Sequence, residues 1–187
     1  MIKIAIILPY KERYTANLAG AASIWVKDYI NKSNLFNQTK IYGHISKKEK
    51  PLTRNFINVP LNKYFFSKTI NYMDFFYKSF CRYNFEIIEI HNRPEYLKYL
   101  IKKKVNSNFL LIFHNNPLDI KGSKTIKERL FLLENCHKIL FVSKWVKNKF
   151  FTGLGITTNS NCEIAFPSIN LVKNFNKKKK KTNHFCW

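Results

Sequence analysis

Short apolar runs alternate along this sequence with longer segments in which apolar residues recur at helical spacing, and this alternation limits the folds that the chain can adopt. Apolar runs such as Ile2–Leu8 and Phe109–Phe113 have the length and composition of buried strands. Strands that alternate with helices predict an α/β fold with a doubly wound, mainly parallel sheet and helices on both faces. The strands are expected at residues 2–8, 39–44, 56–59, 85–90, 109–113, 139–142 and 162–166.

The helices are predicted from apolar residues that should lie on one face and pack against the sheet. The stripes are Leu18, Ala22, Trp25 and Tyr29; Phe66, Ile70, Met73, Tyr77 and Phe80; Leu97, Leu100 and Ile101; Ile126, Leu130, Leu133 and His137; and Val146 and Phe150. The aromatic side chains of the second stripe are expected to belong to the core. Ser143 is expected to cap the last helix, because its hydroxyl can accept a hydrogen bond from a free N–H group.

Two of the expected strands end in polar residues that can form hydrogen bonds, and a proline follows soon after each. These residues are His91, Asn92 and Arg93 after the strand at 85–90, and His114 and Asn115 after the strand at 109–113. Ligands bind at the carboxyl ends of strands in open α/β sheets, because loops and helix N-termini converge there. We therefore expect Gly20, His91, Asn92 and His114 to line one pocket. The alternative is that asparagine and proline only terminate the strands.

Small residues surround the start of the first expected helix, in the order Ala19, Gly20, Ala21 and Ala22. Such a start lets the backbone approach a ligand closely, and the free N–H groups of a helix N-terminus favour anions. Close packing against the sheet is the alternative, and the absence of a full glycine fingerprint favours it.

The chain has 187 residues, a hydrophobic content of 45% and a formal net charge of +22 from 33 basic and 11 acidic residues. This hydrophobic content allows a sizeable core and excludes a chain that is disordered as a whole. The charge favours an anionic partner, such as nucleic acid, a phosphate-bearing substrate or an anionic membrane surface. AT-rich codons also produce a composition rich in Lys, Asn, Ile and Phe, so the charge alone does not identify the partner.

Cysteine usage and hydropathy indicate a cytoplasmic protein with reduced thiols. The four cysteines lie far apart and form no Cys-x-x-Cys pair, which argues against a zinc site. The N-terminal apolar run is too short for the core of a signal peptide, and no segment reaches the length of a transmembrane helix. We expect neither a metal nor a cofactor.

Three segments resemble the N-terminal domain of the family 4 retaining glycosyltransferases, which have the GT-B fold of two Rossmann-like domains. They are residues 7–15 with the sequence ILPYKERYT, residues 89–96 with EIHNRPEY, and residues 140–146 with LFVSKWV. The resemblance implies a Rossmann-like domain over residues 1–175. It also implies transfer of a sugar from a nucleotide-sugar donor to a glycan or lipid-linked acceptor, with retention at the anomeric carbon.

The resemblance assigns residues to the two substrates as well. It implies that Gly20 and Ala21 approach the donor phosphates, and that an acceptor cleft is lined by Arg13, His91, Asn92, Arg93, His114 and Asn115. No catalytic residue is assigned, because in this family the C-terminal domain binds the nucleotide and supplies a basic residue and a Glu-x7-Glu motif. Glu86 and Glu89 do not form that motif.

The absence of that second domain predicts a chain that is inactive alone or nearly so, since one domain provides one wall of a cleft that must exclude water. A basic, disordered tail is expected at 176–187, because the lysine run at 177–181 should stay solvated. One interpretation is a frameshift in the lysine codons. With assumed AT-rich codons, the shifted frame reads as an apolar run that ends in glycine, typical of a strand entering a turn. A natural solvated tail is the alternative.

A second hypothesis is a non-catalytic, basic Rossmann-like module that binds nucleic acid or anionic lipid. The charge permits it, but no nucleic-acid motif is recognised, and the aromatic residues fall on stripes expected to be buried. The glycosyltransferase hypothesis predicts three partners: a sugar acceptor, a missing or separate C-terminal domain, and an anionic membrane surface on the cytoplasmic side. It predicts no specific nucleic acid.

Overall fold

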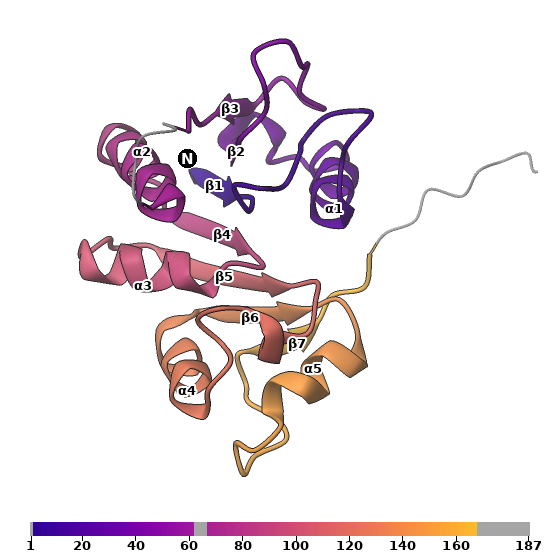
Figure 1. Cartoon of the computed structure of the whole chain (residues 1–187), viewed down its shortest axis with the longest axis vertical. Helices are drawn as coiled ribbons and strands as arrows, with labels where there is room; N and C mark the ends of the chain where they lie inside the picture. Colours follow the sequence, from indigo (N-terminus) through magenta and orange to yellow (C-terminus); the bar gives the residue numbers. More distant parts are fainter. Residues whose placement is uncertain (1, 62–66, 168–187) are drawn as a thin grey trace, which may run out of the picture.

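The computed structural model describes residues 2–61 and 67–167, which form one parallel sheet of seven strands (Figure 1). The strands are β1 (Ile4–Ile7), β2 (Thr39–Gly43), β3 (Phe56–Asn58), β4 (Ile87–His91), β5 (Asn108–Phe113), β6 (Lys138–Phe141) and β7 (Cys162–Ile164). Their order across the sheet is β3-β2-β1-β4-β5-β6-β7, and every neighbouring pair is parallel. Each strand expected from the sequence is present, with small shifts at its ends.

Helices cover both faces of this sheet. They are α1 (Ala21–Ile30), α2 (Lys68–Tyr83), α3 (Pro94–Lys102), α4 (Ile126–Asn135) and α5 (Lys144–Phe151), with the short 3-10 helices η1 (Phe36–Gln38) and η2 (Pro117–Asp119). Helix α1 shares a core cluster with the side chains of Ile4 and Ile6, while the other four α-helices contribute to the cluster on the opposite face. The predicted α/β fold, doubly wound with a parallel sheet and helices on both faces, is confirmed.

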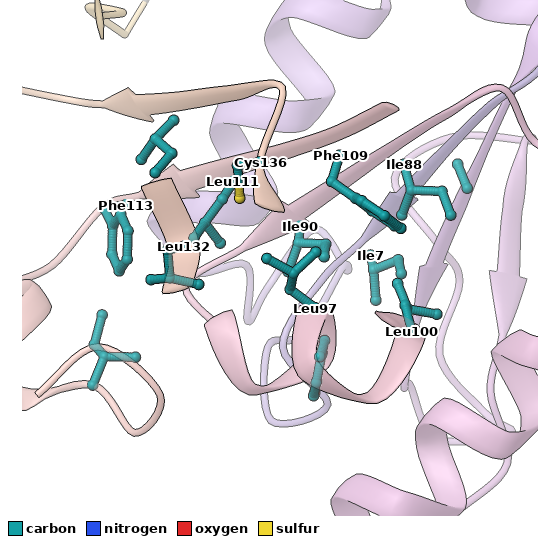
Figure 2. Close-up of a cluster of buried hydrophobic side chains, with 14 of the residues drawn as sticks. Ile7, Ile88, Ile90, Leu97, Leu100, Phe109, Leu111, Phe113, Leu132 and Cys136 are labelled. Carbon is teal, nitrogen blue, oxygen red and sulfur yellow. The ribbon is translucent and has the colours of Figure 1, made fainter. Parts of the chain in front are cut away.

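The larger core cluster lies between the sheet and helices α2 to α5. Figure 2 shows Leu97 and Leu100 of α3 pointing toward Ile7 and Ile90 of the sheet, and all four side chains are fully buried. Burial of an aliphatic side chain of this size contributes about 1.5–3 kcal/mol. This packing holds α3 directly behind the carboxyl end of β4, where the polar strand-end residues lie.

The strand order places a topological switch point between β1 and β4. From β1 the chain passes through α1 to β2 on one side, whereas from β4 it passes through α3 to β5 on the other side. Right-handed crossovers in opposite directions carry the helices to opposite faces. Ligands of open α/β sheets bind at the carboxyl ends of the strands at such a point, and His91 is the last residue of β4.

Two of the predicted helical stripes match the buried faces only in part: Ala22 and Met73 are buried as expected, but other members are not. Leu18 lies before α1 and is 59% exposed, whereas Val26 of this helix is fully buried. In α2, Tyr72 and Phe76 are fully buried and Ile70 is 48% exposed. These segments contain apolar residues on more than one side, so periodicity alone did not identify the side that meets the sheet.

Helix α4 buries an arginine where an apolar stripe was expected. Arg129 is 2% exposed, while Ile126 and Leu130 of the expected stripe are 49% and 42% exposed. The Arg129 guanidinium donates hydrogen bonds to the carbonyl oxygens of Ser123 at 3.1 Å and Thr152 at 2.7 Å. The stripe prediction was wrong because these loop carbonyls need buried donors, and a guanidinium supplies several in fixed geometry.

The predicted domain end at residue 175, the tail at 176–187 and the frameshift interpretation lie outside the described residues, as does Phe66. Among the described helices, none combines the length and the hydropathy that crossing a membrane requires.

Candidate functional site

His91 and His114 lie side by side at the carboxyl ends of β4 and β5. The parallel register places His91 opposite Ile112, and His114 follows two residues later. Nδ1 of His91 lies 2.8 Å from Nε2 of His114, and the ring centroids are 5.1 Å apart. The two polar strand ends found in the sequence therefore meet in one cluster.

A carboxylate forms the inner end of this cluster. Glu89 precedes His91 by two positions on β4, so both side chains point to the same face of the sheet. Glu89 Oε1 lies 2.5 Å from Nε2 of His91 and accepts a hydrogen bond from the hydroxyl of Tyr29 at 2.6 Å. The His91 side chain is 0% exposed and that of Glu89 is 12% exposed, so the contact is shielded from water.

Trp25 of α1 covers the two histidines. Its ring centroid lies 5.5 Å from that of His91 and 5.3 Å from that of His114, in edge-to-face geometry for both. Tyr29, one helical turn later, packs against Trp25 with a centroid distance of 5.2 Å. The helix thus adds an aromatic wall to the site.

Asn92 joins the two strand ends through a left-handed backbone conformation, with a φ of 48°. Asparagine tolerates this region better than most non-glycine residues. Its N–H donates to the carbonyl of Ile112 at 2.9 Å, and its Oδ1 accepts from the N–H of His114 at 2.8 Å. These two hydrogen bonds fix the backbone that carries both histidines.

Arg93 occupies the N-cap position of α3, next to this cluster. Its Nε atom is buried and has no hydrogen-bond partner, and its guanidinium forms no ion pair with any other described residue. The guanidinium carbon lies 5.9 Å from the centroid of the Tyr10 ring. The guanidinium therefore lies near the ring of Tyr10, a residue that packs against the core cluster on the face opposite α1.

Two other residues that were predicted to line the cleft, Arg13 and Asn115, are placed differently from the histidines. Nη1 of Arg13 forms an ion pair with Oε2 of Glu49 at 2.8 Å, and no contact with either site histidine is seen among the described residues. Asn115 is exposed immediately after His114. Neither is held in the cluster in the way that His91, Asn92 and His114 are, and the binding roles of all these residues stay predictions.

The N-terminus of α1 already holds a carboxylate. Glu12 Oε1 accepts a hydrogen bond from the backbone N–H of Ser23 at 3.1 Å. A Cβ atom on Gly20 would lie 2.4 Å from the same oxygen, so a larger residue at this position would displace the Glu12 carboxylate. Ala21 is exposed beside it. The donor-phosphate role of Gly20 and Ala21 stays a prediction, and it would bring phosphate close to Glu12.

Replacing Glu12 by alanine should lower the free energy of unfolding by about 1 kcal/mol, because α1 would lose a charge-assisted hydrogen bond at its N-terminus. Urea denaturation followed by circular dichroism measures the change. Glu134→Ala, at an exposed position of α4, is the control and should change stability by less than about 0.5 kcal/mol. Equal stability of the two variants would contradict the capping role of Glu12.

Sequence reasoning missed three members of the cluster: Glu89, Trp25 and Tyr29. The two aromatic residues were assigned to the core, and Glu89 was considered only for a motif that it does not form. The sequence did carry one signal for Glu89, because residues two apart in a strand share a face and Glu89 lies two positions before His91. Tyr29 could not be connected to Glu89, 60 positions away, without knowing where α1 packs.

A separate cavity of about 350 Å³ lies between the N-terminal ends of α3 and α4. Its lining includes Glu95, Lys98, Lys121 and Phe131, and it contains no residue of the histidine cluster. Because α3 and α4 pack on the sheet face opposite α1, this cavity and the cluster are distinct. In residues 2–61 and 67–167 we find no group of three His, Cys, Asp or Glu side chains placed to hold a metal ion.

The fold and the cluster together define a Rossmann-like α/β domain with a polar site at the carboxyl edge of its sheet. Models of known protein families give no match to the sequence, and neither do curated proteins. Solved structures do resemble it.

Sucrose-phosphate synthase from Thermosynechococcus elongatus has a TM-score of 0.61 and 9% identity, over 87% of this chain and 47% of that chain. HepE from Anabaena in complex with UDP has a TM-score of 0.60 and 7% identity, over 90% and 45%. A glycosyltransferase from Rickettsia africae has a TM-score of 0.57 and 16% identity, over 90% and 44%. The chain thus spans about half the length of these proteins, and its fold is that of a GT-B glycosyltransferase-like domain.

Proposed function

We propose that this chain is the acceptor-binding half of a glycosyltransferase, which transfers a sugar from a nucleotide-sugar donor to a glycan or lipid-linked acceptor. The cluster of His91, Asn92 and His114 at the carboxyl edge of the sheet carries this proposal. Sugar hydroxyls require donors and acceptors that converge on one position, and the His114 imidazole and the Asn92 amide offer both. The similarity of the fold to GT-B proteins supports the same assignment.

The donor would bind to a second domain, supplied by a further part of the protein or by a separate chain. A leaving diphosphate needs fixed positive charges, and the reacting centre must be shielded from water. One domain offers one wall of such a site, so the chain alone would be inactive or nearly so. Gly20 and Ala21 would face the donor phosphates across the cleft. Retention at the anomeric carbon, as in family 4, is the stereochemistry that the sequence resemblance supports.

A binding screen tests this function against the alternative of a basic nucleic-acid module, which the net charge of +22 favours. We expect saturable binding to a glycan or glycolipid, with affinity about tenfold lower in His114→Ala, since one lost hydrogen bond to a ligand costs about 1.4 kcal/mol. Binding to DNA or RNA should fall steeply with salt. Salt-resistant nucleic-acid binding without any glycan binding would contradict the proposal.

Association with the cytoplasmic face of a membrane is part of the proposal, because lipid-linked acceptors are presented there. Each Lys or Arg near an anionic leaflet contributes about 1 kcal/mol. Liposome sedimentation should therefore show binding to vesicles that contain phosphatidylserine, and added salt should abolish it. Neutral phosphatidylcholine vesicles are the control. Equal binding to both kinds of vesicle would contradict an electrostatic attachment.

A further inference from the structure

The two site histidines belong to a longer chain of hydrogen bonds, and the inner end of this chain determines its direction. Burial and the charge of Glu89 raise the pKa of Tyr29 well above its ordinary value, so the phenol keeps its hydrogen and donates it to Glu89. An ionised carboxylate only accepts hydrogen bonds. Nε2 of His91, 2.5 Å from the same oxygen, must therefore carry a hydrogen.

The tautomer of His114, at the outer end of the chain of hydrogen bonds, follows from this assignment. A neutral His91 with a hydrogen on Nε2 has a lone pair on Nδ1. This lone pair faces Nε2 of His114 at 2.8 Å, so the hydrogen of His114 lies on Nε2 and its own lone pair on Nδ1. Nδ1 of His114 has no hydrogen-bond partner in the described part of the chain. His114 is half-buried, whereas His91 is fully buried, so of the two rings that of His114 is the one open to a ligand.

We propose that Glu89 and His91 are positioning residues, which hold His114 in the tautomer whose accessible Nδ1 accepts a hydrogen bond from a substrate hydroxyl. A sugar acceptor is rich in such hydroxyl donors. The identity of this ligand rests on the proposed function, whereas the tautomer is a property of the free chain.

Three surrounding features keep this arrangement in place. Trp25 packs edge-on against both rings and limits access of water to the inner hydrogen bonds. Asn92 fixes the backbone N–H of His114. Burial lowers the pKa of His114 to about 3, so this imidazole is neutral near pH 7. A neutral ring of fixed tautomer can present a lone pair, which a charged ring cannot.

The tautomer can be read directly by ¹⁵N NMR of the histidine rings at pH 7, with the His114 signals assigned from a His114→Asn variant. We expect a protonated Nε2 and an unprotonated Nδ1 in the unmodified chain. Glu89→Gln should preserve this pattern, because its amide oxygen can still accept from His91. Glu89→Leu should release it, so that both tautomers of His114 appear. Glu86→Leu, at an exposed position three residues earlier, is the control and should change nothing.

Two results would overturn the proposal. A hydrogen on Nδ1 of His114 in the unmodified chain would mean that His91 is charged and that its Nδ1 donates to Nε2 of His114. An unchanged His114 pattern in a folded Glu89→Leu variant would mean that Glu89 does not control the tautomer. If Glu89→Leu does not fold, the spectrum of the unmodified chain still decides. The expected tautomer without glycan binding would uphold the positioning role and refute the proposed acceptor.

Discussion

Replacing Phe113 by alanine should lower the free energy of unfolding by about 3–5 kcal/mol, because the change removes a large side chain from the centre of the core. Phe113 is the last residue of β5 and is fully buried. Its ring stacks on that of Phe141 at 5.8 Å and packs against Phe150 at 5.6 Å. Figure 2 shows it in the same cluster as Leu111 and Leu132.

The loss should extend to the site, since His114 follows Phe113 directly and depends on the same strand end. Chemical denaturation measures the stability, and the NMR signals of His114 measure the local effect. Phe166→Ala removes the same ring from a position that is 73% exposed, and it should change stability by less than about 0.5 kcal/mol. A loss below about 1 kcal/mol for Phe113→Ala would show that this cluster does not hold β5 in place.

Lowering the pH from 7 to 4.5 should decrease the free energy of unfolding by about 2 kcal/mol through His114 alone. Burial and the facing His91 lower the pKa of His114 from 6.5 to about 3 in the folded chain. Between these two values the unfolded chain binds a proton that the folded chain does not. Stability is therefore complete above about pH 6.5 and is lost as the pH falls toward 3.

The pH range from 7 to 4.5 separates the effect of His114 on stability from the effect of the carboxylates. The pKa of Glu49 is lowered from 4.5 by hydrogen bonding to Ser46 and by Arg13, and that of Glu163 is lowered from 4.5 by Lys138. The stability that these carboxylates contribute is complete above about pH 4.5 and is lost only as the pH falls below it. Denaturation curves at several pH values test the prediction. A His114→Asn variant should be less sensitive to pH between 7 and 4.5. The same slope in the variant and the unmodified chain would contradict the assignment.

The central part of the sheet could be predicted from the sequence because β1 and most of β2 and β5 are buried on both faces. The runs at residues 4–8 and 109–113 are apolar and bounded by polar or proline residues, so their identity does not depend on which face meets which helix. The helices differ in this respect. Their buried side depends on how each packs against the sheet, which is why Ile70 and Leu130 were assigned to the core and are exposed.

The candidate site was predictable only in part, for a similar reason. His91 and His114 end neighbouring parallel strands, and the topology alone brings such ends together. The contact between Tyr29 and Glu89 requires α1 to lie over β4, and sequence spacing does not contain that information. The carboxylate of Glu12 beside Gly20 likewise depends on how the loop after β1 folds back.

Mapping a glycan ligand onto the chain would show whether the carboxyl edge of this sheet binds a sugar acceptor, as proposed. Titration of ¹⁵N-labelled protein with the best glycan from the screen should shift the amide signals of His91, Asn92, Arg93, His114 and Asn115. The same titration of His114→Ala should show weaker binding at the same place. Shifts confined to the cavity between α3 and α4, or to the amino edge of the sheet, would contradict that proposal.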